Sequence, residues 1–104
     1  MKHFGYVMAT RALVDGKKKV GFMYREKSEG DDSGWRFFSG EEEQEYVDNV
    51  ENIKIYDIQT ILDIDRGVQP YLNSAVNSAF ERDTVTGCFK VIEDFGFGAE
   101  IEEV

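Results

Sequence analysis

The sequence is short of the residues that build disulfides, metal centres and hydrolytic active sites. It has one cysteine, Cys88, and one histidine, His3. One cysteine cannot form a disulfide within the chain, which is typical of proteins kept in a reducing compartment. Zinc sites take their ligands mainly from cysteine and histidine, and a catalytic triad needs a histidine as its base. We therefore expect no metal ion, no cofactor and no catalytic residue.

Long apolar runs are also absent. No stretch of the chain approaches the roughly 18 apolar residues of a membrane span. The segment Met1–Tyr6 has no apolar core of the kind found in secretory signal peptides. We therefore expect a cytoplasmic protein that does not associate with a membrane.

Basic residues are few compared with acidic ones, and the formal net charge is −9. Residues 26–51 carry ten acids and two bases, and residues 93–104 carry five acids and no base. Such an excess repels phosphate backbones, so a nucleic-acid partner is not expected. A basic protein partner would be attracted by it. The alternative is that the charge serves only to keep the domain soluble.

What the chain does contain is enough aromatic and aliphatic side chain for one core. Hydrophobic residues make up 41% of its 104 residues, a length that suits one domain. We expect a single domain over residues 1–104 and a loosely ordered acidic tail over residues 93–104.

The first half of the chain predicts three strands. Residues 6–13 and 20–25 have strand-like composition, and Asp15-Gly16 between them is a strong hairpin signal, which predicts an antiparallel pair. Residues 35–38 are mostly aromatic and predict a third strand.

Two helices are predicted by their starting residues. Ser39 followed by Glu42 forms a capping-box pattern and predicts a helix over residues 40–47. Asp57 can cap a second helix, whose apolar residues recur at helical spacing: Ile58, Ile61 and Leu62.

The remaining segments predict further strands. Residues 53–56 indicate one strand, and residues 79–82 and 88–92 indicate a second hairpin with a loop over residues 83–87. Cys88 lies in an apolar run, so its thiol is expected to be buried. The fold class that follows is α+β, with an antiparallel or mixed sheet of about five strands and two helices packed on one face.

The run from Asp32 to Glu41 holds the only tryptophan beside a charged turn. Trp35 can be the main anchor of the core, or it can be partly exposed as a hot spot for a partner. Arg25 and Arg36 can pair with nearby acids and hold the loop, or one of them can contact a carboxylate of a partner.

Several segments together resemble the bacterial immunity protein 33 family, first catalogued as a domain of unknown function. The resemblance covers roughly residues 7–92 and is carried by Val20–Arg25, Asp32–Gly40, Glu43-x-x-Tyr46, Asn52-Ile53, Tyr56-Asp57, Pro70–Leu72 and Ala79–Arg82. It implies a cytoplasmic α+β domain, and some relatives are proposed to neutralise toxins of polymorphic or contact-dependent systems. The family supplies no catalytic residues that could be transferred to this chain.

The favoured hypothesis is a non-enzymatic protein-binding domain, an immunity protein that covers a basic toxin. The residues proposed for partner binding are Arg25, Asp32, Ser33, Trp35, Arg36, Glu41, Glu42, Glu43 and Glu45. One alternative is a small-molecule binder or enzyme with a pocket around Asp32, Ser33, Trp35 and Arg36. Another is a structural domain that self-associates through a strand edge. The expected oligomeric state is a monomer or a homodimer.

Overall fold

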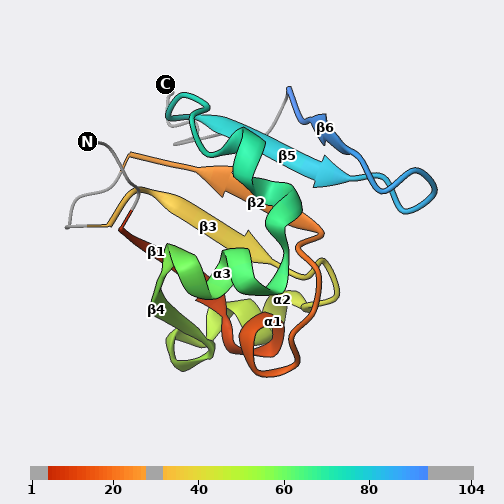
Figure 1. Ribbon diagram of the computed structural model, residues 1–104. Coiled ribbons are helices and arrows are strands. Elements are labelled where there is room, and N and C mark those ends of the chain that lie inside the picture. Colours follow the sequence, from red (N-terminus) through yellow and green to blue (C-terminus); the bar gives the residue numbers. More distant parts are fainter. Residues whose placement is uncertain (1–4, 28–31, 94–104) are drawn as a thin grey trace, which may run out of the picture.

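A six-stranded mixed sheet runs through the molecule in the order β4-β1-β3-β2-β5-β6 (Figure 1). The computed structural model describes residues 5–27 and 32–93. The strands are β1 (Tyr6–Thr10), β2 (Phe22–Arg25), β3 (Trp35–Phe38), β4 (Ile53–Asp57), β5 (Ser78–Arg82) and β6 (Phe89–Val91). The helices are α1 (Arg11–Asp15), α2 (Gln44–Asp48) and α3 (Ile58–Ile64), with short 3-10 helices η1 (Val50–Asn52) and η2 (Arg66–Tyr71). The predicted α+β class is confirmed, with one strand more than expected.

The hairpin predicted between the first two strands is wrong. β1 pairs with β3 in parallel and with β4 in antiparallel fashion, while β2 lies between β3 and β5. The chain leaves β1 directly into α1, because the Thr10 hydroxyl accepts a hydrogen bond from the Leu13 amide at 3.2 Å and caps the helix. Gly16 then ends this helix, with its amide donating to the Ala12 carbonyl at 3.1 Å. The Asp15-Gly16 signal therefore marks a helix end.

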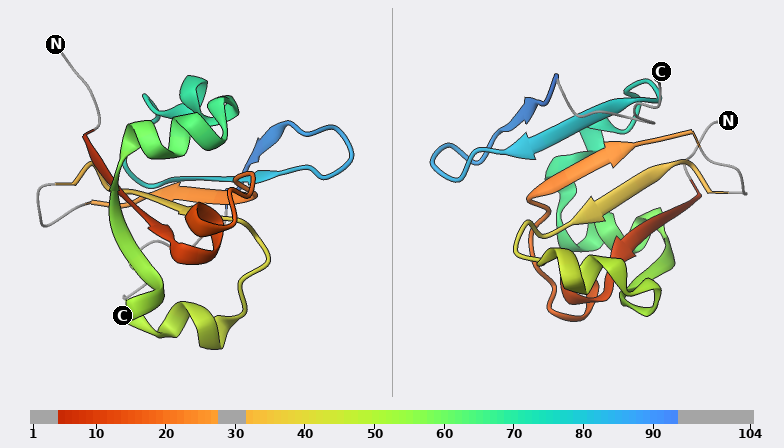
Figure 2. Two further views of the ribbon diagram at one scale, coloured as in Figure 1. Left: turned by 60° about the horizontal axis from the view of Figure 1, so that its bottom comes forward. Right: turned by 180° about the vertical axis from the view of Figure 1, so that it is seen from behind.

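One face of the sheet forms the core with α3 and η2. Met23, Phe37 and Phe80 are paired across three neighbouring strands and share this face. Trp35 lies on the same face of β3 and is 0% exposed, so its burial supports the first of its two interpretations, that of a core anchor. Figure 2 shows α3 and η2 on this side of the sheet and α2 on the other side.

The second predicted helix, α3, is confirmed with its cap. The Asp57 carboxylate accepts from the Gln59 amide at 2.8 Å, at the N-terminus of the helix. The three apolar residues predicted to line one stripe are all buried: Ile58, Ile61 and Leu62. No helix among the described residues is long and apolar enough to cross a bilayer.

The first predicted helix begins four residues later than expected. Half of the capping box is present, since the Glu42 carboxylate accepts from the Ser39 amide at 2.9 Å. The Ser39 hydroxyl, however, accepts from the Glu41 amide at 3.2 Å rather than from the Glu42 amide. Gly40 has a φ of +94°, which lies outside the helical region. The box thus closes a turn, and α2 starts at Gln44.

The predicted second hairpin is confirmed as β5 and β6, which pair in antiparallel fashion. Cys88 is exposed, contrary to the expectation that its thiol is buried. It lies in the connecting loop before a three-residue strand at the edge of the sheet. The predicted acidic tail lies, apart from Glu93, outside the described residues.

Candidate protein-binding site

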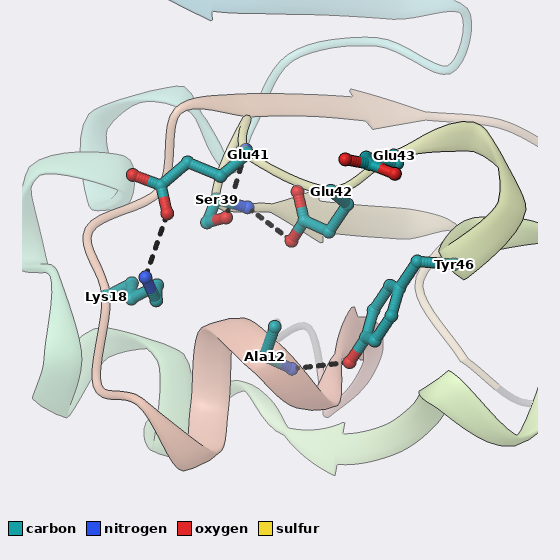
Figure 3. Close-up of a pocket in the computed structure, with 7 residues that line it drawn as sticks. All are labelled: Ala12, Lys18, Ser39, Glu41, Glu42, Glu43 and Tyr46. Carbon is teal, nitrogen blue, oxygen red and sulfur yellow. Dashed lines mark hydrogen bonds and ion pairs between the residues drawn. The ribbon is translucent and has the colours of Figure 1, made fainter.

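A cavity of about 300 Å³ lies where the segment between β3 and α2 faces α1 (Figure 3). Three of the acids predicted to contact a partner line it, together with side chains from α1, from the connection to β2 and from α2. The complete lining is Ala12, Lys18, Ser39, Glu41, Glu42, Glu43 and Tyr46. The tertiary fold therefore brings together residues that lie up to 34 positions apart in the chain.

Glu42 holds this segment in place. Its carboxylate accepts from the Thr10 hydroxyl at 2.6 Å and from the Ser39 and Gly40 amides at 2.9 and 3.0 Å. Partial burial would raise the pKa of Glu42, but these hydrogen bonds outweigh it and hold the pKa below the usual value. Glu42 is therefore an ionised structural carboxylate that joins β1 to the segment before α2.

Tyr46 forms a fixed wall of the cavity. Its hydroxyl accepts from the Ala12 amide at 3.0 Å, one of the amides at the start of α1 that have no partner within the helix. Its carbonyl accepts from the Asn52 side-chain amide at 2.9 Å. Tyr46 is thus held through both its hydroxyl and its backbone, and its ring borders the hollow seen in Figure 3.

The other acids of this segment face solvent. Glu41 pairs with Lys18 at 2.8 Å, and the two side chains are 74% and 45% exposed. Glu43 is exposed and makes no capping hydrogen bond to α2. Glu45 is exposed in the first turn of α2 and does not line the cavity. Glu41, Glu43 and Glu45 are therefore the predicted acids whose charge is exposed to solvent.

The remaining predicted residues lie at the opposite end of β3. The Arg36 side chain is buried by the sheet and forms ion pairs with Asp32 at 2.7 Å and Glu26 at 2.8 Å. Burial would lower the pKa of Arg36, but these two carboxylates outweigh it and raise the pKa. The interpretation that Arg36 holds the loop is therefore the one its contacts support.

Arg25 and Trp35 form a second internal group at this end. The Arg25 guanidinium donates to the Ser33 and Ser74 carbonyls at 3.0 and 2.9 Å and lies 6.0 Å from the Trp35 ring. The Trp35 indole donates to the Leu72 carbonyl at 3.2 Å. Trp35 has no exposed surface, so it cannot act as the hot spot considered from the sequence. The predicted site residues thus fall into two groups. Those at the start of β3 bind one another, and those in the acidic segment, residues 41–45, lie beyond its other end.

The chain matches the family described as the immunity protein Imm33 domain over residues 7–93. It belongs to the Imm33 immunity protein family. No curated protein and no solved structure gives a significant match. The resemblance stated from the sequence, over roughly residues 7–92, is confirmed.

Sequence reasoning about this Imm33 domain missed four lining residues, Ala12, Lys18, Ser39 and Tyr46. Ser39 was interpreted only as part of the capping box. Ala12 carries no signal, because its role depends on an unpredicted helix. Lys18 belongs to the basic run Lys17-Lys18-Lys19, whose charge is complementary to residues 41–45. Tyr46 lies four positions after Glu42, within the acidic segment. A search for opposite charge between the two segments could have found Lys18.

Proposed function

We propose that this Imm33 domain is a non-enzymatic immunity protein that neutralises a bacterial toxin by binding it and covering its working surface. The observation that carries the proposal is membership of an immunity protein family over nearly the whole chain. The partner is then a protein, and the proposal needs no cofactor and no catalytic residue of the immunity protein.

The charge of the exposed surface supports the proposal that the toxin is basic. The chain around α2 exposes five acids and no base: Glu41, Glu43, Glu45, Asp48 and Glu51. Charges at the rim of an interface act mainly on the rate of association and on the choice of partner. A toxin with a basic active surface would be attracted to this segment and be covered by it.

The test uses the protein encoded next to the gene of this chain. We expect the two proteins to co-purify, and we expect Glu45→Lys combined with Asp48→Lys to slow association and to flatten its salt dependence. Asp63→Lys combined with Glu81→Lys changes the net charge equally at exposed sites away from α2. If this control slows association as much, net charge alone explains the attraction. The proposal is wrong if no neighbouring toxin binds this protein more tightly than it binds an unrelated acidic protein.

A second candidate function, self-association, is favoured by the edge strand β4. This strand is one of the two edge strands that the sheet has among the described residues, and Ile55 on it is 58% exposed. Tyr6 lies on the same face of the neighbouring strand and is 53% exposed. An open edge beside apolar residues can pair with a second copy of the chain. Sedimentation equilibrium of the purified protein would then show a dimer that Ile55→Lys dissociates, whereas a monomer at all concentrations rules this function out.

The contacts of the described residues do not favour the small-molecule site predicted near Asp32, Ser33, Trp35 and Arg36. Trp35 is buried, and the Arg36 guanidinium is held by two carboxylates. The Ser33 hydroxyl accepts from the Trp35 amide at 3.4 Å and so belongs to the turn before β3.

A further inference from the structure

We infer that the cavity between α1 and α2 is a receptor for one arginine side chain of the toxin, which inserts between Tyr46 and Glu41. This inference rests on the proposed function and names the chemistry by which the site would recognise its partner. It is carried by the shape of the cavity, its walls and the exchangeable cation at its mouth.

The size and walls of the cavity suit a single long side chain. At about 300 Å³ it lies at the lower limit of pockets that hold small-molecule ligands. The Ala12 side chain and the Tyr46 ring supply an apolar surface against which an aliphatic stem can pack. The carboxylates of Glu41 and Glu43 lie on the same lining, so a cationic head group would meet negative charge.

The chain already places a cation of its own against this lining. The Lys18 ammonium lies 2.8 Å from the Glu41 carboxylate, and both side chains are substantially exposed. Exposed ion pairs of this kind contribute little stability, so the lysine can be replaced at small cost. Lys18 therefore shows where a basic group binds, and in the complex it would give way to the partner's side chain.

An arginine suits this site better than a lysine does. Its planar guanidinium can stack on the face of the Tyr46 ring and donate two parallel hydrogen bonds to one carboxylate. A lysine ammonium is not planar and acts as a single point charge, so it can neither stack in this way nor form the two parallel hydrogen bonds. Glu42 would not compete for the head group, because three donors already occupy its carboxylate.

The test titrates the whole domain with the peptide acetyl-Gly-Arg-Gly-amide and follows backbone amide signals by NMR. We expect saturable shifts at Ala12, Glu41 and Tyr46, and their loss when citrulline, which is uncharged, replaces arginine. Glu41→Gln combined with Glu43→Gln should abolish the shifts. Asp63→Asn combined with Glu81→Gln removes the same two charges at exposed sites outside the cavity and should leave binding unchanged.

Removing the internal competitor gives a second, independent readout. Lys18→Met should lower the Kd of the peptide by about two- to five-fold, the range that follows from the strength of an exposed ion pair. Equal binding of the citrulline peptide, an equal loss in Asp63→Asn combined with Glu81→Gln, or unchanged affinity in Lys18→Met would each overturn the inference.

The same variants separate this inference from the proposed function. If the toxin binds Glu41→Gln combined with Glu43→Gln as tightly as it binds the wild type, the cavity is not the receptor, although the immunity function stands. If the arginine peptide binds as described but no neighbouring toxin does, the cavity binds arginine and the immunity function fails.

Discussion

At the scale of single residues, Trp35 combines ring packing in the core with a buried hydrogen bond. Its ring stacks on Phe37 and Phe80 with centroids 5.8 and 6.4 Å apart. Its indole N–H donates to the Leu72 carbonyl, which ties β3 to the segment after η2. The residue therefore contributes both apolar burial and a buried hydrogen bond, and it has no surface left for a partner.

Replacing this ring should show both contributions. Trp35→Ala should lower the free energy of unfolding by about 3–5 kcal/mol, because it leaves a large cavity in the core. Trp35→Phe keeps an aromatic ring but leaves the Leu72 carbonyl without its donor, which should cost about 1–3 kcal/mol. Urea unfolding measures both, and a loss below about 1 kcal/mol for Trp35→Ala would contradict the buried position.

At the scale of secondary-structure elements, one buried carboxylate joins three segments. Asp65 follows α3 and is 2% exposed. It accepts from the Val20 amide before β2 at 3.0 Å, from the Gly67 amide of η2 at 3.0 Å, and from the Arg82 guanidinium of β5 at 2.8 Å. Burial would raise the pKa of Asp65, but these hydrogen bonds outweigh it and lower the pKa.

The lowered pKa makes this junction sensitive to acid. A carboxyl group whose pKa is lower in the folded state stabilises the fold above its unfolded pKa, about 3.9, and loses this contribution as the pH falls through the folded pKa. Asp65→Asn should therefore destabilise the domain at neutral pH by about 3 kcal/mol or more, because Arg82 remains partly buried without its partner. It should also flatten the fall in stability below about pH 4. Urea unfolding from pH 7 to pH 2.5 tests this, and an unchanged pH profile in the variant would contradict it.

A second junction links β1 to the acidic segment through a single hydroxyl. Thr10 is fully buried, accepts from the Leu13 amide and donates to the Glu42 carboxylate. Thr10→Val keeps the shape but removes the cap of α1 and leaves Glu42 with one donor fewer, so it should cost about 1–3 kcal/mol. Ser39→Ala, which removes only an exposed turn hydrogen bond to Glu41, is the matched control and should cost less. Equal losses in thermal unfolding would argue against a special role for Thr10.

At the scale of the whole molecule, acidic residues outnumber basic ones by 21 to 12. The net charge is −9, and the acids exposed around α2 lie close together in the chain. Repulsion between like charges destabilises a compact state and is screened by salt. The buried ion pair of Arg36 with Asp32 is much less accessible to screening.

Sodium chloride should therefore stabilise the isolated domain. We expect the urea midpoint to rise between about 0.02 and 0.5 M salt, because the Debye length falls from about 20 Å to about 4 Å over this range. Glu45→Lys combined with Asp48→Lys lowers the repulsion and should reduce this dependence. A midpoint that falls with added salt would show that attractive surface pairs, such as Lys18 with Glu41, dominate instead.

Local signals in the sequence determined the elements whose residues act on their near neighbours. The aromatic composition of residues 35–38, the Asp57 cap with its apolar stripe and the alternation of the second hairpin are each contained in a short segment, so each element was predictable. The family was also recognisable from short segments spread along the chain.

The tertiary structure alone decided how the strands pair and what the acids do. Asp15-Gly16 is a turn signal and Ser39-Glu42 is a capping-box signal, yet a helix cap at Thr10 and the φ of Gly40 made the first a helix end and the second a turn. The roles of Glu41 and Glu42 differ because one faces Lys18 and solvent, whereas the other meets three donors. Whether a carboxylate holds the fold or presents charge to a partner depends on which distant groups surround it, and composition and spacing do not encode that.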